Sequence, residues 1–196
     1  MPAASIRPRL ELPDPAVARD RLKAHLRERS LREGVDVVLA SGKRSDVYVD
    51  GKQVTLEGEG LFLVASLLLR QMEGERITAV GGLTLGADPI ASGVALLSHL
   101  AGRPVRAFLV RKDPKTHGTK RSIEGGVGRE DRVVLVDDVI TTGGSVLKAA
   151  EAVREAGAEI AFVSVVVDRE DPDGAAALAP LDYRPIFRLS ELRTRG

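Results

Sequence analysis

Apolar residues follow two alternating patterns along most of the chain: short continuous runs, and longer stretches with helical spacing. Continuous runs predict buried strands, which fall at Ile77–Val80, Val105–Val110, Arg132–Val136 and Glu159–Val167. Stretches with an apolar residue at every third or fourth position predict amphipathic helices, which fall at Glu59–Met72, Pro89–Leu100 and Ser145–Ala156. Strands that alternate with helices in this order are typical of a parallel sheet flanked by helices on both faces. The pattern therefore predicts an α/β fold.

The first part of the chain has a different pattern, with one polar helix and two short strands. The helix is predicted to begin after Asp14, a helix-capping residue type, and to run to about Arg32, with Gly34 as its stop. Short β-like runs follow at Val35–Leu39 and Asp46–Asp50, on either side of a polar turn. We expect a small N-terminal hood, mainly from residues 1–55, beside a core of about residues 75–170. The C-terminal segment has no readable pattern.

Length and composition favour one domain and exclude several kinds of protein. A chain of 196 residues, 43% of them hydrophobic, can bury one core, so we expect a single domain over residues 1–196. The net charge of +1 gives no field for a nucleic-acid partner. Without cysteine the chain has no disulfide, thiol nucleophile or thiolate metal site. The N-terminal residues lack the apolar core of a signal peptide and Leu61–Leu69 is too short to span a bilayer, so we expect a cytoplasmic protein without a membrane partner.

The most informative segment is Val133–Ser145, which reads V-V-L-V-D-D-V-I-T-T-G-G-S. It predicts a buried strand that ends in two carboxylates, followed by a Thr-Thr-Gly-Gly turn and the start of a helix. The first N–H groups of a helix are unpaired and carry positive dipole character, so they bind phosphate. The two glycines let the backbone curl around an anion, and the hydroxyls of Thr141, Thr142 and Ser145 add donors. The segment therefore predicts a phosphate site at the carboxyl end of a strand.

Asp137 and Asp138 narrow the class of ligand, because carboxylates repel a bare phosphate. They suit ribose hydroxyls, or a magnesium ion that bridges to the substrate, and a sugar phosphate satisfies both halves of the segment. The alternative is a structural role, in which an aspartate caps the helix and the glycines only form a turn. Neither G-x-x-x-x-G-K-[ST] nor a G-x-G-x-x-G after a strand occurs, so two other phosphate-binding motifs are absent.

Val133–Ser145 resembles the signature of the type I phosphoribosyltransferases, which use phosphoribosyl pyrophosphate (PRPP). The resemblance implies that the acidic pair contacts the ribose hydroxyls of PRPP and that the following loop holds its 5′-phosphate. It also implies their fold, a parallel sheet flanked by helices with a small N-terminal hood. The PRPP-binding residues that it assigns in this segment are Asp137, Asp138, Val139, Ile140, Thr141, Thr142, Gly143, Gly144 and Ser145.

A second segment, Arg111–Gly118, reads R-K-D-P-K-T-H-G and follows a predicted strand. A cationic loop suits a substrate with a pyrophosphate leaving group, because it neutralises charge and excludes water on closing; a solvated surface loop is the alternative. The segment is similar to the catalytic lid of orotate phosphoribosyltransferases, R-K-x-x-K-x-H-G. This resemblance implies a homodimer in which the lid of one subunit closes over the active site of its partner. The PRPP contacts that it assigns to the lid are Arg111, Lys112, Lys115 and His117.

Two shorter segments agree with orotate as the second substrate. Leu39–Asp50 resembles the substrate segment of the same family, a Ser-Gly turn followed by a strand with an aromatic residue. Thr141 and Arg169 match the family's orotate-binding residues. A guanidinium holds a carboxylate in a fixed, bidentate geometry, which suits an acidic pyrimidine.

The chain departs from the family's pattern at two positions. Many members have a lysine directly before the Ser-Gly turn, where this chain has Ala40 and carries Lys43 beyond the turn. Some members have a pyrophosphate-contacting lysine where this chain has Leu85, so that loop is expected to bind through backbone N–H groups. Whether Lys43 replaces the lysine missing at position 40 stays open.

The resemblance implies a pentosyltransferase that joins orotate and PRPP into orotidine 5′-monophosphate, with release of pyrophosphate, in pyrimidine synthesis. Mg²⁺ is expected to bind mainly through PRPP, and no protein side chain is assigned as a metal ligand. The catalytic residues that the resemblance assigns are Lys115, His117, Asp137 and Asp138, with Lys115 or His117 as the proton donor to pyrophosphate. The alternatives are a purine phosphoribosyltransferase, which shares the PRPP loop, and a PRPP-sensing regulator, for which the sequence shows no basic patch.

Overall fold

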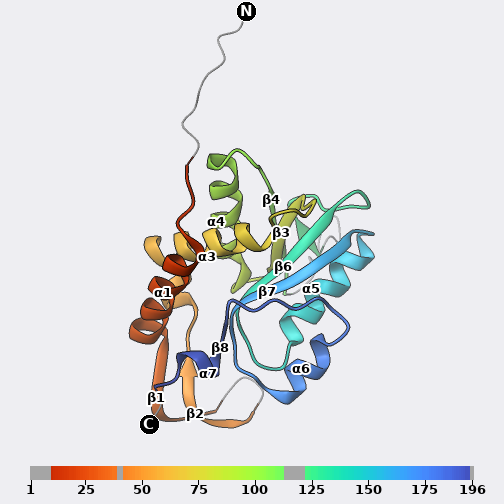
Figure 1. The fold of residues 1–196 in the computed structure, drawn as a ribbon. Coiled ribbons are helices and arrows are strands. Elements are labelled where there is room, and N and C mark those ends of the chain that lie inside the picture. Colours follow the sequence, from red (N-terminus) through yellow and green to blue (C-terminus); the bar gives the residue numbers. More distant parts are fainter. Residues whose placement is uncertain (1–9, 39–41, 113–121, 195–196) are drawn as a thin grey trace, which may run out of the picture.

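The computed structural model describes residues 10–38, 42–112 and 122–194, and it shows a twisted sheet with helices around it (Figure 1). The sheet has six strands in the order β5-β4-β3-β6-β7-β8. Neighbouring strands run parallel except at one edge, where β5 is antiparallel to β4. The strands are β3 (Ala79–Leu83), β4 (Arg106–Val110), β5 (Ile123–Glu124), β6 (Arg132–Ile140), β7 (Glu159–Asp168) and β8 (Phe187–Arg188). The predicted α/β fold class is therefore confirmed.

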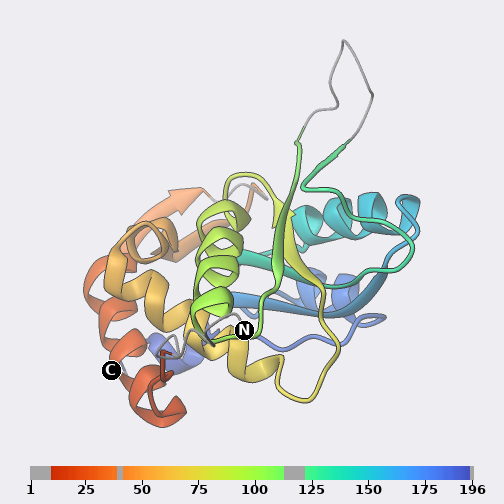
Figure 2. The same cartoon turned by 90° about the horizontal axis from the view of Figure 1, so that it is seen from above.

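Helices cover both faces of the sheet, as the view from above shows (Figure 2). One layer contains α3 (Gly58–Gln71) and α4 (Ala87–Leu100), and the other contains α5 (Gly144–Glu155) and α6 (Pro172–Leu178). Side chains along β6 point alternately to the two faces of the sheet, so this strand contributes hydrophobic residues to both layers. Val134 and Val136 join the hydrophobic cluster of α3 and α4, whereas Val133 and Leu135 join that of α5. None of the described helices is long and apolar enough to cross a membrane.

The hood combines the two ends of the described chain. Its elements are α1 (Pro15–His25), a π-helical turn (Leu26–Ser30), β1 (Leu31–Val38), β2 (Arg44–Val49), α2 (Lys52–Thr55) and the C-terminal α7 (Leu189–Leu192). β1 and β2 form an antiparallel ribbon. The Nε of Arg27 donates to the Leu192 carbonyl at 2.9 Å, and Arg19 and Glu191 form an ion pair at 2.6 Å. The C-terminal segment, which had no readable pattern, thus packs onto the N-terminal hood.

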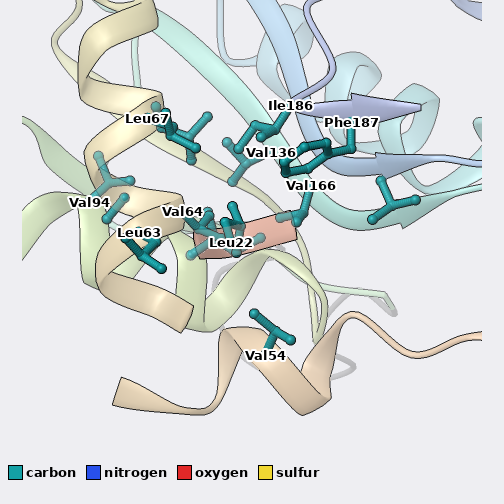
Figure 3. Packing of buried hydrophobic residues seen from close by; sticks show 14 of the residues in the cluster. Leu22, Val54, Leu63, Val64, Leu67, Val94, Val136, Val166, Ile186 and Phe187 are labelled. Atoms are coloured by element: carbon teal, nitrogen blue, oxygen red, sulfur yellow. The ribbon is translucent and has the colours of Figure 1, made fainter. Parts of the chain in front are cut away.

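The hood and the sheet share one hydrophobic cluster, part of which is drawn in Figure 3. Leu22 of α1 and Val64 of α3 lie close together there, with Val136 of β6 and Phe187 of β8 nearby (Figure 3). Each of these side chains has at most 1% of its surface exposed. Burying large aliphatic and aromatic side chains is the main favourable contribution to folding, so this cluster holds the hood against the sheet.

The N-terminal helix is shorter than the sequence pattern predicts. It was expected to reach about Arg32, but α1 ends at His25, a π-helical turn follows to Ser30, and Leu31 already begins β1. Gly34, the expected helix stop, instead lies inside β1 with φ +71°. The pairing register of the ribbon shifts in this region, which a glycine accommodates because it adopts positive φ without steric cost. Gly34 as the helix stop was wrong, because the chain already pairs with β2 from Leu31 onward.

β3 also extends beyond its predicted end. A loop was expected from Gly81 to Gly86, but Gly81 and Gly82 belong to the strand. A Cβ at Gly81 would collide with the backbone carbonyl of Phe108 on β4. The two glycines therefore allow close strand contact, which the sequence pattern could not distinguish from a turn.

β6 is likewise longer than predicted, because it continues through the two aspartates to Ile140. The expected loop Asp137–Gly144 therefore shrinks to the three residues between β6 and α5. The prediction ended the strand where the apolar run ends, but parallel pairing with β7 continues from Val139 to Ile140. The loop predicted over Arg111–Arg129 also contains a strand, the short β5.

Candidate active site

The carboxyl end of β6 turns directly into the N-terminus of α5. Gly143 lies between them with φ +82°, a left-handed conformation that favours glycine. This turn and the first residues of α5 line a cavity of about 360 Å³. Its lining residues are Leu83, Lys112, Asp137, Val139, Ile140, Thr141, Thr142, Gly143, Gly144, Ser145 and Lys148. The structure thus brings together one predicted acid, the whole predicted phosphate loop and the first lysine of the predicted lid.

Helix α6 supports the same turn from behind. A Cβ at Gly174 in α6 would collide with the carbonyl oxygen of Thr141, so a glycine lets the helix lie directly against the turn. A Cβ at Gly143 would meet Ala177 and Leu178 of α6 at 3.4 and 3.7 Å. The turn is therefore packed against α6 at two points, which fixes the backbone that lines the cavity.

Asp137 and Asp138 are consecutive residues of β6, and an oxygen of each lies close to Gly86. Asp137 lines the cavity, whereas the Oδ2 of Asp138 accepts a hydrogen bond from the Lys52 Nζ of the hood at 2.8 Å. Both are buried, with exposed fractions of 7% and 5%. Burial, followed by the neighbouring charge of Asp138, raises the pKa of Asp137 well above its usual range. The pair therefore places carboxylate oxygens at the strand end, where Asp137 lines the cavity and Asp138 is bonded to the hood.

Two glycine backbones lie against this acidic pair. A Cβ at Gly86 would come within 3.0 Å of an oxygen of each of Asp137 and Asp138. A Cβ at Gly51, between β2 and α2, would lie 2.8 Å from the Asp138 Cβ. The loop before Gly86 presents Leu85, whose side chain is 71% exposed, and no cation. The acids are thus enclosed by backbone on two sides.

Arg169 follows β7 and reaches across to the hood. Its backbone N–H donates to the Ile140 carbonyl at 3.1 Å. Its Nη2 donates to the Ser45 Oγ at 3.0 Å and to the Val47 carbonyl at 2.9 Å, both on β2. Burial lowers the pKa of Arg169, but a guanidinium remains charged at physiological pH. The predicted orotate residue therefore bridges the hood and the carboxyl end of the sheet, beside the turn that begins with Thr141.

Lys43 lies near the same boundary but contacts acidic side chains. Its Nζ lies 3.0 Å from an oxygen of Asp171 and 2.7 Å from an oxygen of Asp173. These two aspartates stand at the start of α6, and Asp171 also caps it by accepting from the Asp173 N–H at 3.0 Å. Lys43 thus joins the hood to the helix behind the phosphate turn. Ala40, with which Lys43 was compared, lies outside the described residues.

The predicted lid is only partly within the described chain. The N–H of Arg111 donates to the Ser122 carbonyl at 2.8 Å, and its Nε donates to Glu124 at 2.9 Å. Lys112 lines the cavity. Lys115 and His117, the expected catalytic residues of the lid, lie outside the described residues, and their roles stay predictions.

Two lysines of the site were missed by the sequence analysis. Lys148 lines the cavity, and it follows Ser145 by three residues, which places both on one face of α5. That spacing could have identified it. Lys52 contacts Asp138 from 86 positions away along the chain, and no local spacing could have indicated this contact.

Comparison with known proteins agrees with this geometry. The family model of the phosphoribosyl transferase domain matches residues 65–181, a range that includes the acidic pair and the turn. The chain is therefore a phosphoribosyltransferase. An orotate phosphoribosyltransferase from Rhodopseudomonas palustris is 44% identical over 185 residues, which cover 92% of this chain and 98% of that protein. The chain belongs to the orotate phosphoribosyltransferase family.

Solved structures give the same result. The orotate phosphoribosyltransferase of Mycobacterium tuberculosis in complex with PRPP is 37% identical and has a TM-score of 0.73, covering 89% of this chain and 98% of that one. An adenine phosphoribosyltransferase from Rhodothermus marinus covers 89% of this chain and 99% of its own, with a TM-score of 0.60 at 20% identity. The second likeness concerns the fold alone.

Proposed function

We propose that PRPP binds with its 5′-phosphate in the cavity at the N-terminus of α5 and with its ribose hydroxyls on Asp137 and Asp138. The observation that carries this assignment is the meeting of the buried Asp137, a glycine turn and a helix N-terminus at one cavity of about 360 Å³, with the buried Asp138 directly beside Asp137 on β6. Helix N–H groups and hydroxyls suit the phosphate, while carboxylates suit the hydroxyls of a sugar. The PRPP complex of the similar M. tuberculosis enzyme supports this choice of ligand.

The reaction is that of an orotate phosphoribosyltransferase, a step of pyrimidine biosynthesis. A nitrogen of orotate forms a bond to the anomeric carbon of PRPP while the bond from that carbon to the diphosphate oxygen breaks. The products are orotidine 5′-monophosphate and pyrophosphate. The protein's contribution is to align the two substrates and to stabilise the charge that develops in a site from which water is excluded.

Orotate is assigned to the boundary between the hood and the sheet. Arg169 would bind its carboxylate or a ring carbonyl, and Thr141 would touch both substrates. The support is that Arg169 already bridges β2 and the carboxyl end of β6 through its contacts at 2.9 to 3.1 Å. A substrate at this boundary would lie within reach of the ribose held by Asp138.

Pyrophosphate is assigned to the lid residues Arg111, Lys112, Lys115 and His117. Lys112, which lines the cavity, supports this placement. Lys115 or His117 would donate the proton that the departing diphosphate takes up. The lid would be shared across a homodimer, and the enzyme would act in the cytoplasm without nucleic-acid or membrane partners.

Magnesium would enter with PRPP, bound mainly to the oxygens of that substrate, where it would offset the charge of the phosphates. Among the described residues, no group of three or more His, Asp or Glu side chains could hold a metal ion by itself. We therefore assign the metal's ligands to the substrate.

The direct test is the loss of orotate's ultraviolet absorbance when the protein is mixed with PRPP and magnesium. We expect a fall that requires PRPP, and no turnover of PRPP with adenine or hypoxanthine in place of orotate. An unchanged orotate absorbance together with turnover of a purine base would contradict the assignment of orotate. Loss of the signal on adding a chelator, and its return with magnesium, would test the metal.

A further inference from the structure

One hood residue, Lys52, is bonded directly to the acidic pair of the site. Its Nζ donates to the Asp138 Oδ2 at 2.8 Å. Among the described residues, this is the sole ion pair made by either Asp137 or Asp138. The Asp138 side chain is only 7% exposed, whereas that of Lys52 is 42% exposed. A half-exposed cation thus covers a carboxylate that is otherwise enclosed by protein.

The chain holds Lys52 in this position through its backbone. Lys52 begins α2, and its N–H donates to the Asp50 Oδ1 at 3.2 Å. Gly51 lies so close to Asp138 that a Cβ would be 2.8 Å from the Asp138 Cβ. The other end of α2 is anchored by Val54 and Thr55, which have no exposed surface. The contact is therefore built into the way the hood meets the sheet.

This contact places a positive charge where negative charges of the protein and of the substrate would come together. Asp137 and Asp138 are adjacent buried carboxylates, and a substrate that carries several phosphates adds more negative charge next to them. The neighbouring loop contributes no compensating side chain, because Leu85 stands there. The charge of Lys52 lowers the pKa of Asp137, against the opposing effects of burial and of Asp138. Among the described residues, Lys52 is thus the cation that pairs with a carboxylate of Asp137 or Asp138.

We propose that Lys52 is a positioning residue for PRPP, which fixes the side-chain direction of Asp138 so that this carboxylate can accept hydrogen bonds from the ribose. The proposal rests on the assignment of Asp138 to the ribose given above. It connects the hood, on the orotate side of the site, to the affinity for the other substrate.

The test compares Lys52→Met, which keeps the length of the side chain and removes its charge, with Lys52→Arg, which keeps the charge. A matched control is Lys23→Met, since Lys23 lies on α1, away from the cavity. For each variant, the dissociation constant of PRPP with magnesium is measured by calorimetry, together with kcat, both KM values and the thermal unfolding midpoint. The binding measurement remains informative even if the purified protein does not turn over orotate.

We expect Lys52→Met to weaken PRPP binding and to raise its KM about 10-fold or more, since a hydrogen bond between charged groups is lost. The KM for orotate stays within about 2-fold of the original, and Lys52→Arg recovers most of the PRPP affinity. The charge of Lys52 lowers the pKa of Asp137, so removing that charge raises this pKa and moves the acid limb of kcat/KM for PRPP to higher pH. The control variant retains the wild-type values.

A purely structural role would give a different result. Lys52→Met would then lower the unfolding midpoint while leaving the PRPP dissociation constant and the pH profile unchanged, and this outcome would overturn the proposal. Equal increases in the KM of both substrates would overturn it as well, because they would indicate a general loosening of the hood.

Discussion

At the scale of single residues, the site depends on positions where a side chain is absent. Gly86 is the clearest case, because a Cβ there would come within 3.0 Å of oxygens of both Asp137 and Asp138. The neighbouring atoms are polar ends of buried carboxylates, which are already fixed by the contacts of the strand. Any side chain at this position must therefore displace the groups assigned to the ribose.

We expect Gly86→Ala to lower kcat/KM for PRPP by about 100-fold or more, because misplacing groups at a site by about 1 Å costs a factor of this size. The measurement is steady-state kinetics combined with circular dichroism to confirm folding. Gly58→Ala is a matched control, since a Cβ at Gly58 would meet nothing within 4 Å. Similar kinetic losses in both variants would contradict the reason given for Gly86.

Lys115 gives a second prediction at this scale, since the family resemblance assigns it to the departing diphosphate. We expect Lys115→Ala to lower kcat by about 100-fold or more, the cost typical of removing one charge-stabilising donor. The unfolding midpoint should change little, because the hydrophobic clusters are formed by other residues. Kinetics and thermal unfolding of the same preparation check this, and an equal loss of activity and of folded protein would count against the role.

At the scale of elements, α6 is both the support of the phosphate turn and the partner of the hood. Gly174 allows α6 to lie against Thr141. The Nζ of Lys43 forms ion pairs with oxygens of Asp171 at 3.0 Å and Asp173 at 2.7 Å. The ion pairs shift the pKa values of their partners. Lys43 lowers the pKa of Asp171, and the two acids raise the pKa of Lys43. α6 therefore contacts both the hood, where we propose that the base binds, and the turn that we assign to the phosphate.

We expect Lys43→Ala and Asp173→Asn to have the same effect, a rise of about 2- to 5-fold in the KM for orotate, because exposed ion pairs are weak. The unfolding midpoint should stay nearly constant for the same reason. Steady-state kinetics on the two single variants and the double variant check this. If Lys43 instead bound orotate itself, Lys43→Ala alone would have a large effect and Asp173→Asn almost none.

The sequence could predict those parts of the fold and the site whose residues are consecutive or closely spaced along the chain. Val133–Ser145 contains the strand, the acids, the turn and the helix start in consecutive residues, so its fold and most of its site residues followed from the pattern. The contacts of Lys52 and Lys43 could not be predicted, because they join segments 86 and up to 130 positions apart. Strand ends were misjudged where aspartates or glycines interrupt an apolar run, since parallel pairing continues through both.

At the scale of the whole molecule, the hood is closed by the two ends of the described chain. Leu192 of α7 has no exposed surface and belongs to the cluster that also contains Leu22 of α1 and Val136 of β6. One hydrophobic core thus extends from the hood to the sheet. This continuity favours a single folding unit, which is the prediction made from length and composition.

We therefore expect one cooperative transition in thermal or denaturant unfolding, monitored by circular dichroism and by calorimetry. Leu192→Ala should lower the free energy of unfolding by about 2–5 kcal/mol, the usual cost of truncating a buried leucine. Leu56→Ala is the control, because Leu56 is 73% exposed and its truncation should cost little. Two separate transitions, with only the first shifted by Leu192→Ala, would show that the hood unfolds independently.

The adjacency of Asp137 and Asp138 also bears on how far the two halves of the site can change independently. Asp137 lines the cavity of the turn and α5, and its neighbour Asp138 is bonded to Lys52 of the hood. The hood and the phosphate half are therefore joined at a single strand end through neighbouring residues. A mutation that remodels the hood around Lys52 also moves the carboxylate assigned to the ribose, so we expect base preference and PRPP affinity to change together.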